Sequence, residues 1–267
     1  MNHRPLILRL APISLRTKLY YHLYRGKTTD SELFNGAPLE FARKVRMDLK
    51  PSDEGHACIA FTGFYELGLS RKIVSLAKRG GLLVDVGANY GYFSLIWASC
   101  RSGNQVIAYE ASSRNHSFLR FNIDKNNLSN SIQIRTEAVG KEECTMEFYL
   151  GPENQTGWGG LLSTSEGGEI SKVPVVKLDD QFEENAFINV LKIDIEGADF
   201  WALEGAKNLL QSKRIGHVFY EENQERMKSL GIKAGEAKSF LESLGYRVLL
   251  IEGGHGATVS EFEAVAT

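Results

Sequence analysis

Apolar runs of strand length alternate with helical patterns along most of this chain. Apolar or alternating runs predict strands at 82–86, 105–110, 132–136, 190–195, 215–221 and 246–251. Apolar positions at helical spacing predict helices at 92–101, from 112 or 113 onward, up to 209, near 223–230 and at 234–244. Repeated strand–helix units indicate an α/β fold with a Rossmann-like, doubly wound, mainly parallel sheet, which binds ligands at the carboxyl ends of its strands.

Further strands are predicted outside these units. Alternation at Met146, Phe148 and Leu150 predicts a strand whose partner is 173–176, and a glycine-rich loop, 151–168, lies between them. The segment 258–266 predicts an antiparallel last strand of the sheet. Ahead of the first strand of the sheet we predict short strands at 39–49 and 58–61 and a helix at 63–77.

The N-terminal segment differs from the rest in charge. No acidic residue precedes Asp30, whereas this segment contains Arg4, Arg9, Arg16, Lys18, Arg25 and Lys27 among apolar residues. We therefore divide the chain into a basic, helical N-terminal extension with some strand (1–50) and a ligand-binding domain (51–267). We expect the extension to form a cap docked on that domain. The alternative is peripheral contact with an anionic membrane surface.

Charge, hydropathy and missing motifs argue against several classes of protein. A net charge of −2 gives no field for general nucleic-acid binding, and no apolar run reaches the length of a membrane span. The three cysteines lack C-x-x-C spacing, which predicts reduced thiols in a cytoplasmic protein without a zinc site. The motifs H-E-x-x-H and G-x-S-x-G are absent, which argues against zinc and serine hydrolases.

The segment 83–94 carries the strongest signal for a ligand. A strand ends near Asp85, and a tight turn with Gly87 and Gly91 leads into a helix. Its G-x-x-x-G spacing differs from the G-x-G-x-x-G turn that holds a pyrophosphate, and an acidic residue ahead of the turn favours a cation. Glu110 ends the next strand, where a carboxylate accepts hydrogen bonds from ribose hydroxyls. A nucleoside cofactor with an ammonium and a sulfonium, S-adenosylmethionine, fits better than a dinucleotide. The alternative is a purely structural glycine turn.

The segment 191–197 contains the second motif. In an extended chain Lys192, Asp194 and Glu196 point to one side, at the end of the strand beside the glycine turn. Glu221 or Glu222 ends the following strand and joins them. These carboxylates can act as a general base, bind a divalent metal or hold a substrate hydroxyl. The alternative is that one of them caps the next helix and the other pairs with Lys192. Sequence does not establish a metal.

Four more residues are considered as candidates for the site: Glu137, Ala138, Trp158 and His217. Glu137 and Ala138 follow the third strand, where side chains flank an adenine. Trp158 lies in the glycine-rich loop and serves either to stack on a substrate ring or to anchor packing. His217 lies early in its strand, and we expect it to be a satisfied core histidine.

Four separated motifs resemble FkbM-type methyltransferases in their order and spacing. They are 84–91, 138–140, 173–180 and 191–198, and Tyr65 with Glu66 resembles the lead-in of that family. The resemblance implies a class I, S-adenosylmethionine-dependent methyltransferase that O-methylates sugars, glycans or polyketide-type metabolites. It implies catalytic roles for Asp194, Glu196 and Glu221. It implies cofactor contacts from Glu66, Asp85, Gly87, Asn89, Gly91, Glu110, Ala111, Glu137, Ala138 and Asp194.

Two other functions stay open at this point. One is an NAD-dependent oxidoreductase, although the phosphate-binding turn is missing. The other is a non-catalytic nucleoside-binding module that keeps the fold without turnover. The chain also departs from the family pattern at Ala111 and Ser112, where a turn with proline is common.

Overall fold

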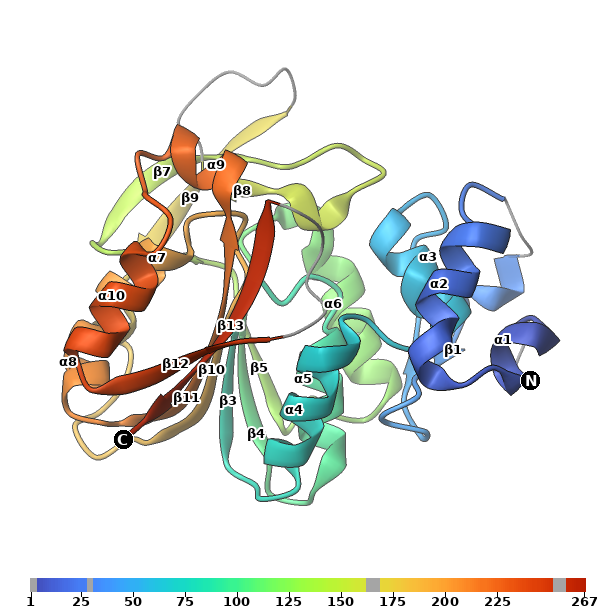
Figure 1. Cartoon of the computed structure of the whole chain (residues 1–267), viewed down its shortest axis with the longest axis horizontal. Helices are drawn as coiled ribbons and strands as arrows, with labels where there is room; N and C mark the ends of the chain where they lie inside the picture. The colour runs from blue at the N-terminus through green and yellow to red at the C-terminus, as the bar shows by residue number, and fades with distance from the viewer. Residues whose placement is uncertain (1–3, 28–30, 162–168, 252–257) are drawn as a thin grey trace.

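The computed structural model describes residues 4–27, 31–161, 169–251 and 258–267. A seven-stranded sheet with the order β12-β13-β11-β10-β3-β4-β5 forms its centre (Figure 1). The strands are β3 (Leu82–Val86), β4 (Gln105–Tyr109), β5 (Ile132–Arg135), β10 (Ile188–Ile193), β11 (Ile215–Asn223), β12 (Tyr246–Leu250) and β13 (Val259–Ala266). Neighbours from β11 to β5 pair in parallel, and β13 runs antiparallel between β11 and β12. The predicted α/β class and the antiparallel last strand are confirmed.

Helices cover both faces of this sheet, because successive strand residues point to opposite sides. On one face Leu83 packs in a core with α4 (Leu67–Ala77) and α5 (Tyr92–Cys100). On the other face Val84 packs with α7 (Asp199–Glu204), α8 (Lys207–Gln211) and α10 (Glu236–Ser243). The remaining helices of the domain are α6 (Ser113–Lys125) and α9 (Gln224–Ser229).

A second, four-stranded sheet lies over the carboxyl end of β10. It has the order β6-β9-β7-β8 and contains β6 (Ala138–Val139), β7 (Cys144–Tyr149), β8 (Gly160–Leu161) and β9 (Ile170–Val176). The predicted pairing of β7 with β9 is confirmed, with Met146 opposite Val173. Two short 3₁₀ helices, η2 (Thr156–Trp158) and η3 (Leu178–Asp180), belong to the same region. Gly160 packs against Glu196, which places this sheet above the second motif. Part of the glycine-rich loop, 162–168, falls outside the described residues.

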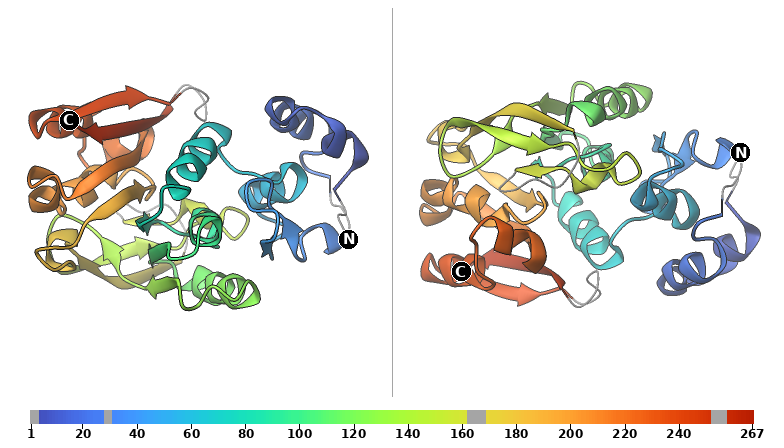
Figure 2. Two further views of the ribbon diagram at one scale, coloured as in Figure 1. Left: turned by 90° about the horizontal axis from the view of Figure 1, so that it is seen from below. Right: turned by 90° about the horizontal axis from the view of Figure 1, so that it is seen from above.

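The N-terminal extension lies beside α5 and α6, away from β12 and β13 (Figure 1, Figure 2). It contains α1 (Leu6–Leu10), α2 (Ile13–Leu23), η1 (Ser31–Leu33), β1 (Ala37–Pro38) and β2 (Arg46–Met47), and α3 (Glu54–Thr62) follows. Leu8 and Tyr20 belong to the same buried cluster as Trp97. The buried Arg4 donates from Nε to the Ala60 carbonyl (3.2 Å). The core is therefore continuous across residue 50.

One predicted strand in this region is wrong, and another is much shorter than predicted. Residues 58–61 lie within α3, because strong caps fix a helix at both ends. The Asp53 carboxylate accepts from the His56 amide (2.9 Å), and Gly63, with φ of 91°, ends the helix through a bond from its amide to the Ile59 carbonyl. Within 39–49 only Arg46–Met47 is a strand, paired with β1. No helix among the described residues is long and apolar enough to cross a bilayer.

Candidate active site

A cavity of about 990 Å³ lies at the carboxyl ends of β3, β4, β10 and β11. Its other walls come from α2, from the start of α3 and from the loop that contains η2. The predicted site residues that line it are Glu66, Gly87, Asn89, Glu110, Ala111, Glu137, Ala138, Asp194, Glu196 and Glu221. The structure therefore brings most of the candidate residues to one space. Asp85 and Gly91 lie behind its wall.

The glycine turn is shaped by a close approach of two backbone segments. Gly87 has φ of 81°, and a Cβ there would lie 1.9 Å from the Asp194 carbonyl oxygen, so only glycine fits. The amides of Gly87 and Ala88 donate to the Tyr109 carbonyl (3.0 and 2.9 Å). These amides are already paired within the chain, whereas a pyrophosphate turn presents them bare.

Glu110 is held by the turn that it faces. Its Oε2 accepts from the Asn89 amide (2.7 Å), and its Oε1 accepts from the Ser112 amide (2.8 Å) and from Asn115 Nδ2 (3.3 Å). Burial raises the pKa of Glu110 to about 7, although these hydrogen bonds act to lower it. An ionised carboxylate has about four acceptor sites. Three of these sites are taken, so Glu110 keeps capacity for one further donor, at Oε2.

Asp85 faces a buried lysine. Lys192 lies opposite Asp85 across the β3–β10 pair, with Nζ 3.5 Å from the Asp85 carboxylate and 3.2 Å from the Asp194 carboxylate. The other Asp85 oxygen accepts from Ser94 Oγ (2.6 Å). Burial acts to lower the pKa of Lys192, but the charges of Asp194 and Asp85 outweigh it and raise that pKa. Lys192 thus stays protonated and orients Asp194 at the cavity edge.

Glu196 does not continue the alternation that the sequence predicted. β10 ends at Ile193, and Glu196 has a left-handed backbone with φ of 55°. Its Oε2 accepts from Asn223 Nδ2 (3.2 Å) and lies 3.8 Å from Arg226 Nε. Glu196 therefore points toward the start of α9, while Asp194 is held by Lys192, and both line the cavity.

The acidic side chains at this end of the cavity raise one another's pKa values. Burial first, and the charge of Asp194 second, raise the pKa of Glu196 to about 8 and that of Asp199 to about 7. The same two causes, with Asp199 and Glu66 added, raise the pKa of Glu221 to about 11. Several carboxyl groups here hold protons near neutral pH, which is a common property of catalytic sites.

Asp199 was missed by the sequence analysis. Its Oδ2 accepts from the Ile195 amide (3.3 Å) and its Oδ1 from the Glu221 amide (2.9 Å). It therefore binds together the ends of β10 and β11. The only local signal was a further acidic residue at the start of the next helix.

The candidates on the other walls are held by arginines. Glu137 accepts from Arg135 Nη2 (2.9 Å), and this bond lowers the pKa of Glu137 although burial opposes it. Trp158 is half exposed, and the Arg226 guanidinium lies 5.6 Å from its ring centroid and donates to its carbonyl (3.1 Å). His217 lies away from the cavity, with Nδ1 3.0 Å from Glu263.

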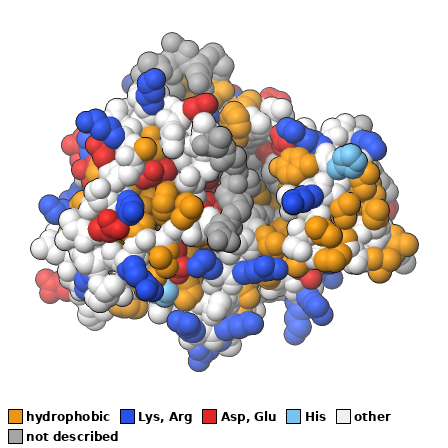
Figure 3. All heavy atoms as spheres, in the orientation of Figure 1, with side chains coloured by type: hydrophobic (Ala, Val, Ile, Leu, Met, Phe, Trp, Pro, Cys, Tyr) orange, Lys and Arg blue, Asp and Glu red, His pale blue; other side chains and the backbone are white. Residues whose placement is uncertain are grey.

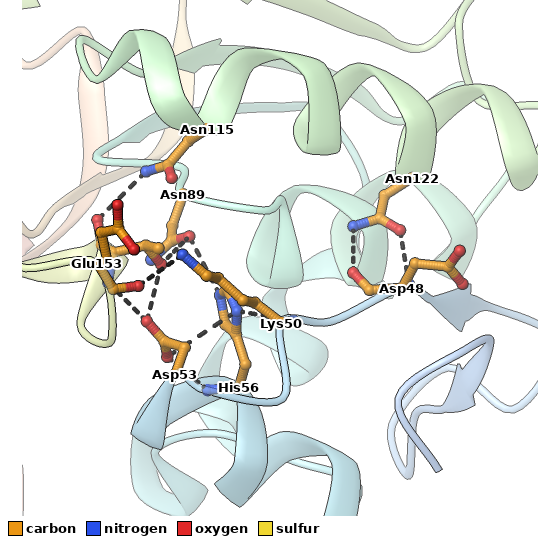
Figure 4. Close-up of polar contacts among 9 residues, drawn as sticks. Asp48, Lys50, Asp53, His56, Asn89, Asn115, Asn122 and Glu153 are labelled. Atoms are coloured by element: carbon orange, nitrogen blue, oxygen red, sulfur yellow. Dashed lines mark hydrogen bonds and ion pairs between the residues drawn. The ribbon is translucent and has the colours of Figure 1, made fainter. Parts of the chain in front are cut away.

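A polar network joins the extension to the turn and to the loop above it (Figure 4). The Asp53 carboxylate accepts from the Thr156 amide (2.6 Å) and hydroxyl (3.0 Å). The Lys50 amide donates to His56 Nδ1 (3.3 Å), so His56 Nε2 carries the proton toward Asn89 Oδ1 (3.3 Å). The network fixes Asn89, whose amide holds Glu110. The sequence analysis did not single out Asp53 or His56.

No group of three or more histidine, cysteine, aspartate or glutamate side chains arranged to hold a metal ion occurs within the described ranges. At the cavity edge Lys192 forms an ion pair with Asp194, and Arg226 forms one with Glu196.

Comparison with known proteins gives a family match and several similar folds. The family model described as "Methyltransferase FkbM domain" matches residues 85–248. The chain is similar to a methyltransferase FkbM from Methylobacillus flagellatus (16% identity, 70% of this chain and 43% of that chain, TM-score 0.49). It is also similar to a METTL16 methyltransferase domain (14%, 95% and 78%, TM-score 0.49) and to an O-methyltransferase from Thermotoga maritima (12%, 76% and 66%, TM-score 0.46). The match thus spans less than half of the Methylobacillus protein. No functionally curated protein matches significantly.

Proposed function

Because the chain belongs to the FkbM methyltransferase family, we propose that it transfers the methyl group of S-adenosylmethionine to a hydroxyl of a sugar, a glycan or a secondary metabolite. One observation carries the proposal. A single cavity has Glu110, held by the glycine turn, on one wall and a group of carboxylates with raised pKa values on another.

The nucleoside half of the cofactor is proposed to bind along the ends of β4 and β5. Glu110 would accept a hydrogen bond from a ribose hydroxyl at the one acceptor site that its three partners leave free. Ala111, Glu137 and Ala138 line the same wall and would flank the adenine. A dinucleotide fits less well, because the turn amides of Gly87 and Ala88 are already paired.

The acidic end of the cavity would hold the positively charged half of the cofactor. When bound, S-adenosylmethionine supplies an electrophilic methyl group on a sulfonium. Glu66, Asp194, Glu196 and Glu221 line this end. The Asp194 carboxylate lies 3.2 Å from the buried Lys192 ammonium, which fixes its position at the cavity edge. We assign to Asp194 the role of orienting and stabilising the cofactor's positive charge.

Proton removal is assigned to the neighbouring carboxylates. A hydroxyl attacks efficiently only as its proton leaves, and a base works best when its pKa lies near the working pH. Glu196, with a pKa of about 8, meets this condition. Glu221, with a pKa of about 11, would hold a proton and donate a hydrogen bond. We therefore place Glu196 as the base and Glu221 as a hydrogen-bonding partner of the acceptor.

The cavity supports a polar acceptor of moderate size. Its volume of about 990 Å³ leaves room beside a nucleoside cofactor, because drug-sized ligands occupy pockets of roughly 300–1,000 Å³. The half-exposed ring of Trp158 lines the cavity near Glu196 and offers a face on which a sugar ring can stack.

The proposal is tested in two steps on the full chain. Calorimetry should show binding of S-adenosylmethionine and S-adenosylhomocysteine but not of NAD. Methyl transfer from radiolabelled cofactor is then measured over neutral oligosaccharides and polyhydroxylated metabolites, with and without EDTA. Glu196→Gln should lose transfer and keep S-adenosylhomocysteine affinity, and Glu143→Gln, a change at an exposed residue directly before β7 that does not line the cavity, should alter neither.

Each outcome has a defined meaning. Binding of NAD without S-adenosylhomocysteine would overturn the cofactor assignment. Cofactor binding without transfer to any acceptor would favour the non-catalytic module. Inhibition by EDTA that Mg²⁺ reverses would make the carboxylates metal ligands.

A further inference from the structure

The outer side of the N-terminal extension exposes large apolar side chains. Leu6 is 64% exposed, Leu10 77%, and Ile7 and Leu15 nearly half. Leu8 and Tyr20 of the same two helices are buried against the rest of the protein. In Figure 3 hydrophobic side chains gather over α1 and α2. We call the side formed by Leu6, Ile7, Arg9, Leu10, Leu15 and Lys18 the outer face. Clustered exposed apolar groups of this kind mark contact surfaces.

The charged side chains that the segment 4–27 itself contributes are basic. Residues 4–27 contain no aspartate or glutamate. Arg16 pairs with Glu40 (2.6 Å) and Arg25 with Glu54 (2.6 Å) from other parts of the chain. Arg9, Lys18 and Lys27 are exposed and form no ion pair among the residues that the structure describes. The outer face therefore combines exposed leucines with two cations, Arg9 and Lys18, that no described acidic side chain pairs.

This combination fits one kind of partner. A second copy of the chain would bring its own Arg9 and Lys18 against these cations, and like charges oppose such contact. An anionic bilayer provides acyl chains for the leucines and phosphate or carboxylate groups for the cations, which is how amphipathic basic segments bind membranes without crossing them. We infer that the outer face binds to the surface of an anionic lipid bilayer.

The opening of the cavity lies close to the outer face. Lys18 and Tyr21 of α2 line the cavity and are also exposed, Tyr21 to 42%. The cavity therefore opens beside the outer face. Binding to a bilayer brings the opening to the lipid surface, where an acceptor attached to a lipid is within reach. The inference stands on exposure and charge and does not depend on the methyl-transfer proposal.

The test uses full-length protein and vesicle sedimentation. The protein should pellet with vesicles of phosphatidylcholine and phosphatidylserine and stay in solution with phosphatidylcholine alone. Raising the salt from about 0.1 M to about 1 M should release it, because the Debye length falls from about 10 Å to about 3 Å. Each cation near an anionic surface contributes roughly fivefold to partitioning, so Arg9→Gln, Lys18→Gln and Lys27→Gln together should weaken it on the order of 100-fold.

Two comparisons make the outcome specific. Leu6→Ser with Leu10→Ser should also abolish pelleting. The matched control changes three exposed lysines of the catalytic domain, Lys207, Lys228 and Lys233, to glutamine and should pellet like wild type. All variants should keep the melting temperature of the wild type.

Several results would overturn the inference. These are no pelleting with phosphatidylserine vesicles, equal loss in the lysine control, or pelleting that salt does not affect. A stable dimer in light scattering that Leu10→Ser disrupts would assign the face to a second copy instead.

Discussion

Binding of S-adenosylmethionine should release protons that binding of S-adenosylhomocysteine does not. The two ligands differ at the sulfur, which carries a positive charge only in the former. In the proposed site that charge lies beside Asp194, Glu196 and Glu221, the carboxyl groups of the cavity edge. A cation beside a carboxyl group favours its ionised form and so lowers its pKa.

The magnitude follows from the pKa values. Glu196, with a pKa of about 8, is about 90% protonated at pH 7. An opposite charge at close range lowers a carboxyl pKa by about 1 to 3, and a fall to about 6 releases about 0.8 proton. Asp199, with a pKa of about 7, adds at most about 0.5 proton. Glu221 has a pKa of about 11 before binding, so it stays mostly protonated at pH 7 after a fall of the same size. The expected difference between the ligands is therefore about 1 proton at pH 7.

Calorimetry in buffers of different ionisation enthalpy counts these protons. Any proton that Glu110 loses on binding ribose is common to both ligands and cancels in the difference. In Glu196→Gln the difference should fall below about 0.5 proton, the share left to Asp199. As the pH rises from about 6 to about 8, affinity for S-adenosylmethionine should increase relative to S-adenosylhomocysteine, since deprotonation then costs less. Equal proton counts for the two ligands would show that the sulfonium does not lie at the acidic cluster.

Three further changes test separate parts of the site. Glu110→Gln should weaken both cofactor forms alike by about 1–3 kcal/mol in calorimetry, because a charge-assisted acceptor is lost; unchanged affinity would mean that Glu110 does not contact the ribose. Asp194→Asn should slow methyl transfer on the order of 100-fold or more with little change in S-adenosylhomocysteine affinity, and normal turnover would remove Asp194 from catalysis. Gly87→Ala should destabilise the protein by more than about 2 kcal/mol in thermal unfolding, since the new Cβ meets the Asp194 carbonyl; an unchanged melting temperature would contradict the close approach.

The central sheet was predictable because its signals are local. The strand Leu82–Val86 and the helix from Tyr92 have the predicted bounds to within one residue, since apolar runs and a glycine turn separate them. The strand predicted at 58–61 failed for an equally local reason. The caps at Asp53 and Gly63 decide that segment, and the apolar run between them suits either a strand or a helix.

The sequence identified most residues that line the cavity, but it did not predict how their side chains are placed relative to one another. Extended geometry placed Asp194 and Glu196 side by side, but the close contact of Gly87 with the Asp194 carbonyl coincides with the end of β10, and the chain turns there. The roles of Asp199 and Asp53 depend on partners far away in the chain. Asp53 and Thr156 are 103 residues apart, and one sequence contains no sign that they meet.

The network of Figure 4 also limits how this enzyme can be recombined with its relatives. A chimera that exchanges residues 1–50 would bring a new α2 wall to the cavity, but it would also replace the Lys50 side chain, whose ammonium donates to the Glu153 carbonyl (2.6 Å). The backbone amide of residue 50 donates to His56 Nδ1 (3.3 Å), so a change in the path of the chain at the junction would also disturb the contact of His56 with Asn89. Because the Asn89 amide donates to Glu110, a swap intended to change the acceptor would then affect cofactor affinity as well. Crossovers placed after Gly63 transfer the extension together with α3 and keep Asp53 and His56 with their own Lys50. The segment that can be exchanged as a unit therefore extends through Gly63, beyond the basic extension 1–50.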